Sequence, residues 1–257
     1  MEGAMTVTVN RREMIGLCGG AAAWPFAAHA QQRRLLYLTH SAGYRHDAIP
    51  LSQTILSRIG QNSGLFGVTT TEDVSELSTE NLARYAAVMF YTTGELPMSA
   101  EQKAALLDFV RSGHGFVGVH SATDTLYDWP DYRTLIGGYF DGHPWHQSVR
   151  IDVTDPSDAL VSFLGRAFQI NDEIYQIRDF DEQGSRVLLR LDEKSVDLHR
   201  EGVHQRPYGW PLAWRRSYGQ GRVFYTALGH EQAVWRDARY QQLLLNAIRW
   251  GIDDRVR

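Results

Sequence analysis

The sequence predicts a three-layer α/β fold, in which a mostly parallel sheet has helices on both faces. Short apolar segments alternate with amphipathic ones through the first half of the chain, as in parallel strands joined by helices. The second half has shorter alternating segments, which predict an irregular, β-rich part added to the sheet. With 257 residues, 43% of them hydrophobic, the chain can form one large core.

Four strands and two helices are expected in the first half. The apolar segments 35–39, 66–71, 86–91 and 115–119 are predicted to be strands, and 51–59 a helix. A second helix should begin after Ser99, whose hydroxyl can cap it together with Gln102 at the capping-box position. This helix should end near Arg111, because Gly113 follows.

The second half is expected to contain two helices and four strands. Segment 129–136 is predicted to be a short helix, and 237–250 a closing amphipathic helix. Strands are predicted at 149–153 and 187–191, and a hairpin is predicted at 212–217 and 222–227 around the turn 218–221. Because there is no repeat or linker, residues 31–257 are interpreted as a single domain.

Residues 1–30 have the features of a twin-arginine export signal. The pair Arg11-Arg12 precedes an apolar stretch, and Ala28-His29-Ala30 is typical of a cleavage site. Cleavage near Ala30 predicts a periplasmic or secreted mature protein; the alternative is an untargeted cytosolic N-terminus. The single cysteine, Cys18, lies inside this segment. The mature chain would therefore have no thiolate nucleophile and no cysteine ligand for zinc.

The composition excludes several classes of partner. The formal net charge is −4 and there is no basic stripe, so we expect no nucleic acid. No apolar run approaches the roughly 20 residues of a membrane span, and no nucleotide cofactor is expected. The 11% aromatic residues suit a sugar-binding pocket as well as simple packing. A homo-oligomer is left open.

Gly118-Val119-His120-Ser121-Ala122 resembles the strained strand-to-helix turn that exposes a nucleophile in many hydrolases. The central His120 suits the role of base, acid or metal ligand. If the register shifts by one residue, Ser121 becomes a nucleophile with a histidine as its base. The alternative is structural, with Ser121 capping the next helix and His120 hydrogen-bonded.

Two other segments place imidazoles or carboxylates together. Gly142-His143-Pro144-Trp145-His146 predicts a rigid loop, because Pro144 prevents a regular helix. Its two imidazoles suit a zinc ion, unless one is exposed and the other bonded to backbone. Asp172 and Glu173 are adjacent, so on a strand only one of them can point into a pocket. A solvated loop is the alternative for this pair.

The polar residues are expected to meet at one edge of the sheet. Ligands bind beyond the carboxyl ends of strands in open parallel sheets. Polar side chains follow four predicted strands, in the loop 40–46, at Thr93-Gly94-Glu95, at His120-Ser121 and at His230-Glu231. The sequence therefore predicts a polar pocket at this edge.

These segments, in this order, resemble the trehalose-utilisation (ThuA-like) family. The matching stretches are 44–47, 118–124, 139–146, 172–175, 211–214 and 218–230, within about 34–252. The resemblance implies a class I glutamine-amidotransferase-like, flavodoxin-like α/β fold. It also implies a role in the metabolism of trehalose or related glycosides, including 3-keto-glycosides. In that superfold the turn after the strand holds a cysteine. His120 stands there instead, so a glutamine amidotransferase is not expected.

We therefore expect an exported, His-based hydrolase or lyase that acts on a sugar ligand. His120 and His230 are expected to exchange protons, with Glu173 or Asp172 as helper. His46, His143 and His146 are expected to bind a divalent metal, zinc above all, or sugar oxygens.

The residues expected to bind substrate are Arg45, His46, Thr93, Gly94, Ser121, Asp124, Trp145 and Tyr175. Two alternatives stay open. One is a non-catalytic sugar-binding protein, and the other is a hydrolase with Ser121 as nucleophile and His230 as base.

Overall fold

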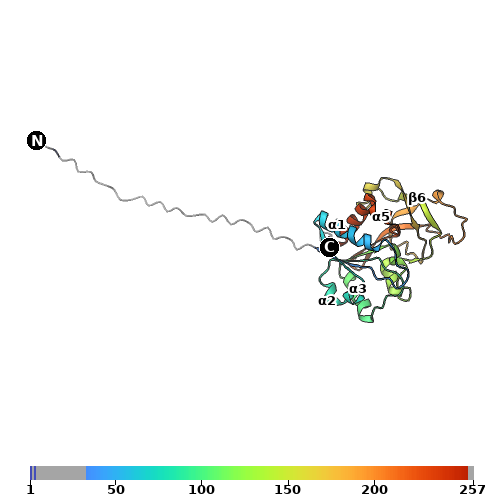
Figure 1. Ribbon diagram of the computed structural model, residues 1–257, viewed down its shortest axis with the longest axis horizontal. Coiled ribbons are helices and arrows are strands. Elements are labelled where there is room, and N and C mark those ends of the chain that lie inside the picture. The colour runs from blue at the N-terminus through green and yellow to red at the C-terminus, as the bar shows by residue number, and fades with distance from the viewer. Residues whose placement is uncertain (2, 4–32, 254–257) are drawn as a thin grey trace. The chain divides into compact units, whose positions relative to one another are not determined.

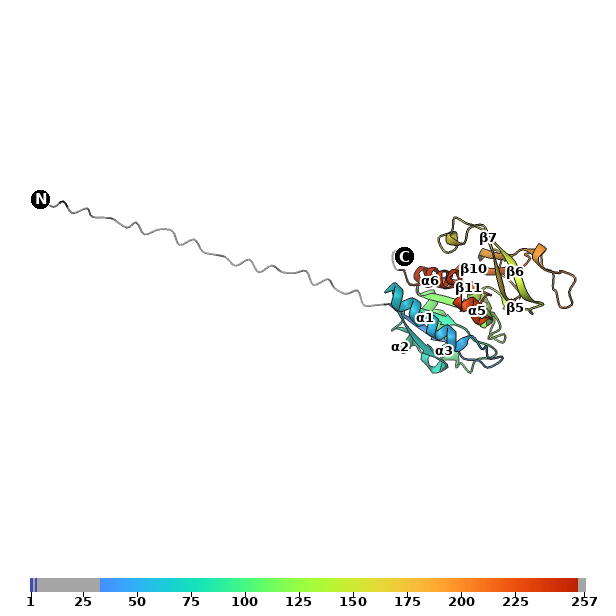
Figure 2. The ribbon, with the colours of Figure 1, turned by 45° about the horizontal axis from the view of Figure 1, so that its top comes forward.

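In the computed structural model, which describes Met1, Gly3 and residues 33–253, one nine-stranded sheet organises the chain (Figures 1 and 2). The strand order is β2-β1-β3-β4-β11-β10-β9-β6-β7. The first five strands pair in parallel; they are β2 (Phe66–Thr71), β1 (Arg33–Leu38), β3 (Ala87–Phe90), β4 (Gly115–Val119) and β11 (Gly221–Thr226). All residues of β3 and β4 are buried, as expected where helices cover both faces of a parallel sheet.

The sheet continues beyond β11 through antiparallel strands. They are β10 (Pro211–Tyr218), β9 (Arg186–Leu191), β6 (Trp145–Val153) and β7 (Ala167–Ile174). The predicted hairpin joins β10 to β11 and is confirmed. A separate two-stranded sheet pairs β5 (Tyr139–Phe140) with β8 (Ile177–Arg178). The β-rich second half is therefore largely an ordered extension of the same sheet.

Helices lie on both faces of the sheet (Figures 1 and 2). On one face, α1 (Ile49–Ser63), α5 (Gln232–Arg236) and α6 (Ala238–Ile252) contact one another. On the other lie α2 (Thr79–Leu82), α3 (Ala100–Arg111) and α4 (Pro130–Ile136). Short 3-10 helices cover Val74–Leu77, His120–Thr123, Ser162–Leu164 and Glu193–Ser195. None of the helices in 33–253 is both long and apolar enough to cross a membrane.

The sequence located most of these elements closely. Strands 66–71 and 115–119 are confirmed, and so is α3 with its capping box between Ser99 and Gln102. Helix α1 is longer than predicted and ends where Gly64 adopts a left-handed conformation, with φ 67°. The predicted export signal falls, apart from Met1 and Gly3, outside the described residues.

One segment was predicted wrongly. Trp145 and His146 were expected in a loop but begin β6. They pair there with Ile174 and Glu173 of β7, a strand that lies more than twenty residues later in the chain. The pairing supplies the backbone hydrogen bonds that a loop would lack, and a sequence window cannot detect it. The prediction of a rigid loop therefore holds only for the residues before Trp145.

The strand register brings the predicted polar residues to one edge. Leu38 is level with Phe90, Phe90 with Gly118, and Val119 with Thr226. The loops that follow β1, β3, β4 and β11 therefore start side by side.

Candidate functional site

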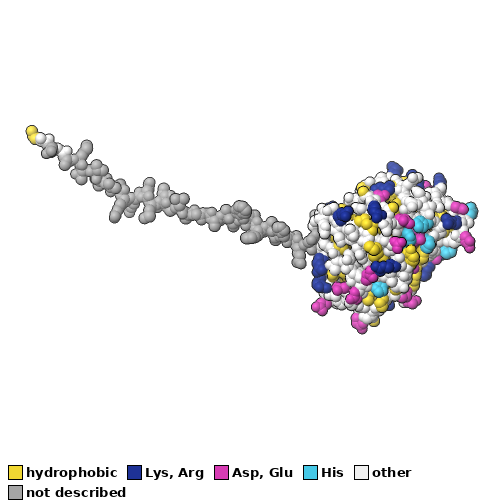
Figure 3. All heavy atoms as spheres, viewed as in Figure 1, with side chains coloured by type: hydrophobic (Ala, Val, Ile, Leu, Met, Phe, Trp, Pro, Cys, Tyr) yellow, Lys and Arg dark blue, Asp and Glu magenta, His cyan; other side chains and the backbone are white. Residues whose placement is uncertain are grey.

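A cavity of about 320 Å³ lies at this edge of the sheet. Its lining combines three aromatic rings, three imidazoles and two carboxylates: Tyr44, Phe140 and Tyr175, His46, His143 and His230, and Asp124 and Glu173. On the face shown in Figure 3, histidine and acidic side chains gather beside the region of β6. The expected pocket is therefore present as a site of mixed aromatic and charged character.

His120 forms the floor of the site and is fully buried. It starts a 3-10 helix after β4 with φ 46°, the left-handed region that a side chain rarely adopts. The strained turn predicted from the glycine-flanked segment is thus present. The Nδ1 of His120 lies 2.7 Å from the carbonyl oxygen of Ala227, which can only accept a hydrogen bond. Nδ1 is therefore the donor in this bond, and Nε2 is the ring nitrogen that faces Glu173 and His230.

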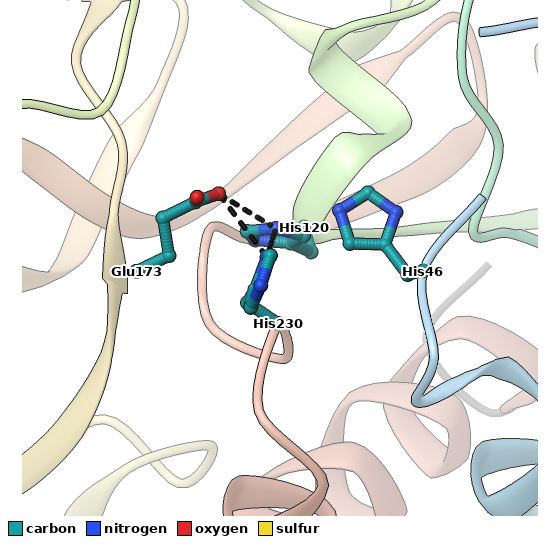
Figure 4. Close-up of side chains that lie close together, drawn as sticks. All are labelled: His46, His120, Glu173 and His230. Carbon is teal, nitrogen blue, oxygen red and sulfur yellow. Dashed lines mark hydrogen bonds and ion pairs between the residues drawn. The ribbon is translucent and has the colours of Figure 1, made fainter. Parts of the chain in front are cut away.

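Glu173 joins the imidazoles into one cluster (Figure 4). Its Oε2 lies 3.4 Å from Nε2 of His120 and 3.2 Å from Nδ1 of His230. These two nitrogens are 3.3 Å apart. Burial alone would raise the pKa of Glu173, but its contacts with the imidazoles of His120 and His230 outweigh it and hold the pKa well below its usual value. The carboxylate is therefore ionised.

His46 completes the cluster from the loop after β1. Its ring centroid is 4.8 Å from that of His120 and 5.1 Å from that of His230. Burial, and then the neighbouring imidazoles, lower the pKa of His46 to about 3, so this ring is neutral. Only 4% of His46 is exposed, and its Nδ1 has no hydrogen-bond partner in the described part of the chain. His46, His120, Glu173 and His230 are called the imidazole cluster below.

Asp172 does not enter the cavity, because it faces the opposite side of β7 from Glu173. Its carboxylate accepts hydrogen bonds from the backbone N–H groups of Gly229, at 2.7 Å, and Glu231, at 3.0 Å. The interpretation of Asp172 as a proton-transfer partner is corrected to a role in positioning His230. The alternation of a strand predicted that only one of the two carboxylates would point inward, and Glu173 is that one.

The three histidines predicted as a metal site do not form one group. His143 contacts Glu173 Oε1 through Nδ1, at 3.1 Å, and lies at the cavity wall. His146 hydrogen-bonds instead to Glu231 Oε1, at 2.7 Å. The two point to different carboxylates because Pro144 and the start of β6 separate them. His46 groups with His120 and His230 rather than with either of them.

Thr93 and Gly94 shape the site without lining it. Thr93 Oγ1 donates to the carbonyl of Tyr44, at 2.8 Å, and Gly94 N–H donates to that of Asp124, at 2.8 Å. Gly94 has φ 73°, and a Cβ there would lie 2.8 Å from the backbone nitrogen of Gly43. Both residues were predicted to bind substrate. They hold the loops of Tyr44 and Asp124 together instead.

Three further predicted substrate-binding residues lie away from the cavity. Arg45 forms an exposed pair of hydrogen bonds with Glu72. Trp145 is fully buried and its indole N–H donates to the carbonyl of Asp197, so its ring packs in the core rather than against a ligand. Ser121 is fully buried, and its Oγ has no hydrogen-bond partner among the described residues. No base therefore activates it in this arrangement.

Asp124 and Tyr175, both predicted to bind substrate, line the cavity. Burial raises the pKa of Asp124, and Tyr127 donates its hydroxyl to the Asp124 carboxyl at 2.7 Å. The ring of Tyr175 packs on His120 with centroids 4.1 Å apart. The sequence did not single out Tyr44 and Phe140. The sequence feature that could have indicated them is their position beside Arg45-His46 and before Asp141-Gly142-His143.

A larger hollow elsewhere on the surface is less suited to chemistry. It is lined by Arg186, Arg215 and Trp250 among others. Two of its three arginines, Arg186 and Arg215, pair with Asp158, with Arg215 Nε at 2.9 Å from Oδ2, so most of its positive charge is already paired. The candidate site is therefore the smaller cavity beside the imidazole cluster.

Comparisons with known proteins identify the family of this chain. The sequence pattern of the ThuA family, described as trehalose utilisation, matches residues 34–251. A ThuA-like protein from Bacteroides uniformis has 24% identity and a TM-score of 0.73, over 90% of this chain and 96% of that one. Another from Parabacteroides merdae has 20% identity and a TM-score of 0.68, over 86% and 90%.

A more distant similarity involves part of a larger enzyme. A β-galactosidase from Bacillus circulans sp. alkalophilus has 14% identity and a TM-score of 0.53, over 85% of this chain but 31% of its own. At this identity the similarity concerns the fold alone. Among curated proteins, none matches the sequence.

Proposed function

The chain belongs to the ThuA family, described as trehalose utilisation, and from that premise we propose that it is an exported carbohydrate-active enzyme, a hydrolase or lyase of trehalose-related glycosides or their 3-keto forms. The observation that supports this most strongly is the imidazole cluster at the floor of a cavity walled by aromatic rings. Aromatic faces pack against sugar rings, and charged groups bind their hydroxyls.

Within the imidazole cluster, burial alone would lower the pKa of His230, but Glu173 outweighs it and raises this pKa, which favours the charged ring. That ring would stabilise negative charge that develops on a sugar oxygen. In a 3-keto-glycoside the ketone makes the neighbouring C–H acidic. A base takes that proton, the electron pair moves onto the carbonyl oxygen as an enolate, and the enolate then expels the glycosidic oxygen. Positive charge beside the carbonyl oxygen lowers this barrier, and such stabilisation is often the largest contribution to catalysis.

Two residues of the cavity wall suit the proton transfers. His143 is oriented through Nδ1 by Glu173, at 3.1 Å, which leaves its Nε2 free to act as a base. Asp124 is placed to exchange a proton with the leaving oxygen, because it lines the cavity, and burial raises the pKa of its carboxyl. In this proposal His120 and His230 stabilise the developing charge, and they do not carry the proton that is transferred.

The test is a turnover screen on trehalose, other disaccharides and their 3-keto derivatives, with products identified by NMR. We expect turnover by the wild type and a loss of at least about 100-fold in kcat for Glu173→Gln and His143→Asn. His199→Ala is the matched control, because it removes an exposed imidazole that is not part of the cavity lining. Saturable sugar binding by folded protein without turnover of any glycoside would instead favour a binding protein.

Export has a separate test. Full-length protein expressed in a bacterium with a twin-arginine pathway should appear outside the cytoplasm, with the mass of a chain that begins near Gln31. Replacing Arg11 and Arg12 by lysine should retain the uncleaved chain in the cytoplasm. An uncut cytoplasmic wild-type chain would contradict export without affecting the proposed chemistry.

A further inference from the structure

We propose that the imidazole cluster is a binding site for one divalent metal ion of the zinc class. The ligands are Nε2 of His120, Nδ1 of His230 and Oε2 of Glu173, and His46 is the fourth donor. The inference deepens the proposed function, because it names what supplies the positive charge at the floor of the cavity. It also corrects the metal site expected from the sequence, since only His46 of that group takes part.

The spacing of the three closest donor atoms suits a tetrahedral ion. Their separations are 3.4, 3.2 and 3.3 Å, an almost equilateral triangle. Zinc bonds of about 2.0–2.2 Å place neighbouring tetrahedral ligands about 3.3–3.6 Å apart. Octahedral Mg²⁺ at about 2.0–2.1 Å would require about 2.9 Å. The triangle therefore matches one face of a zinc tetrahedron.

The surrounding hydrogen bonds prepare these atoms as ligands. A ligating histidine usually donates its other ring N–H to a carbonyl or carboxylate. His120 does so to Ala227, at 2.7 Å, and its Nε2 lone pair then faces the triangle. Glu173 directs Oε2 to the triangle while Oε1 contacts His143, and Asp172 fixes the backbone on both sides of His230. All three positions are thus held by a second set of contacts.

His46 provides an independent observation. It is 4% exposed, its Nδ1 is unpartnered, and no hydrogen bond of its side chain occurs in the described residues. A buried imidazole without a partner costs about 1–3 kcal/mol. In Figure 4 one ring nitrogen of His46 points towards the other members of the cluster. A metal ion there would satisfy this ring, and the donor atoms of all four residues already lie within 4.8 Å of one another.

The donor set decides the class of ion. Three imidazoles and one carboxylate suit zinc and its neighbours in the first transition series, whereas calcium and magnesium prefer oxygen ligands. His46, Glu173 and His230 also line the cavity, so a sugar oxygen can reach an ion held among them. Such an ion would polarise that oxygen as a Lewis acid.

The experiment measures metal content and metal-dependent stability in the purified mature protein. We expect about one zinc-class ion per chain, and a rise in Tm when zinc is added to protein stripped with a chelator. Cobalt substituted into the same site should give the intense visible absorption of tetrahedral Co²⁺. Glu173→Gln and His230→Asn should each weaken zinc binding by more than about 100-fold.

His146→Ala is the matched control for these variants. It removes an imidazole next to the cluster, which pairs with Glu231 instead, and should leave metal binding unchanged. If neither the Tm nor the activity of metal-free wild type changes when metal is added, the inference is overturned. A proton shared by His230 and Glu173 would then explain their close approach. Loss of metal in His146→Ala but not in Glu173→Gln would also overturn the inference. Metal binding without turnover of any glycoside would overturn the proposed function and leave the metal site standing.

Discussion

Asp172 holds His230 in place through the backbone on either side of it. The two oxygens of this buried carboxylate accept hydrogen bonds from the N–H groups of Gly229 and Glu231, so the loop after β11 is fixed to β7. Gly229 has φ 125°, and a Cβ at this position would lie 2.6 Å from the Tyr240 hydroxyl. The position of one imidazole of the cluster therefore depends on contacts with two other elements, β7 and α6.

Asp172→Asn should disturb this arrangement while leaving the size of the side chain unchanged. An amide nitrogen cannot accept either N–H, so one of the two hydrogen bonds is lost and a buried donor is left unpaired. We expect unfolding measured in urea to show a loss of about 1–3 kcal/mol, and kcat to fall by about 10–100-fold. Asn171→Ala, at the exposed neighbouring position, is the control. Wild-type kcat in Asp172→Asn would contradict a positioning role.

Ser121→Ala should retain turnover. The Oγ of Ser121 is buried without a hydrogen-bond partner in the described residues, so its removal breaks no hydrogen bond there and relieves an unsatisfied hydroxyl. We expect kcat within about two-fold of wild type and a stability change below about 1 kcal/mol. Inactivation of the wild type by a serine-directed reagent, together with an inactive variant, would restore the serine hydrolase alternative.

Tyr44→Ala should weaken substrate binding more than it slows chemistry. Tyr44 lines the cavity and is 62% exposed, and its ring is stacked 6.4 Å from that of His230. Loss of an aromatic face costs about 0.5–1.5 kcal/mol, so KM should rise by up to about ten-fold. Tyr44→Phe should keep most of the binding, and Phe163→Ala, an exposed ring outside the cavity lining, should have no effect. An unchanged KM in Tyr44→Ala would exclude stacking.

Asp141→Asn should make stability less sensitive to acid. Asp141 accepts hydrogen bonds from His204, at 2.9 Å, and Arg206, at 2.6 Å. Burial alone would raise the pKa of Asp141, but these two partners outweigh it and the pKa lies below its usual value. Because the pKa of Asp141 is lower in the folded state than in the unfolded state, its contribution to the free energy of unfolding is present above the unfolded-state pKa. This contribution is lost as the pH falls through the folded-state pKa.

For this solvent-screened pair we expect wild type and Asp141→Asn to differ by about 0.5–1 kcal/mol at neutral pH. The difference should shrink as pH falls below about 4. Urea unfolding of both proteins between neutral pH and pH 3 measures it. A difference that grows with acid would contradict the assignment.

Much of the fold could be read from the sequence because its signals are local. The apolar run of β4, the Ser99–Gln102 capping box and the turn between β10 and β11 each depend on a few neighbouring residues. The same local signals placed His120 and His230 after parallel strands, so their approach to one another was predictable. Strand alternation predicted that only one of Asp172 and Glu173 would point into a pocket, but which one was decided by how β7 pairs with β6.

What the sequence by itself determined is which chemical groups stand at the ends of the parallel strands. Which imidazoles share a centre was decided by tertiary structure. The pairing of Trp145 with Ile174 turned a presumed loop into a strand and separated His146 from His143. The carbonyl of Ala227 fixed the tautomer of His120, and burial kept His46 neutral. These choices depend on strand register and desolvation across more than a hundred residues of chain, which no local pattern contains.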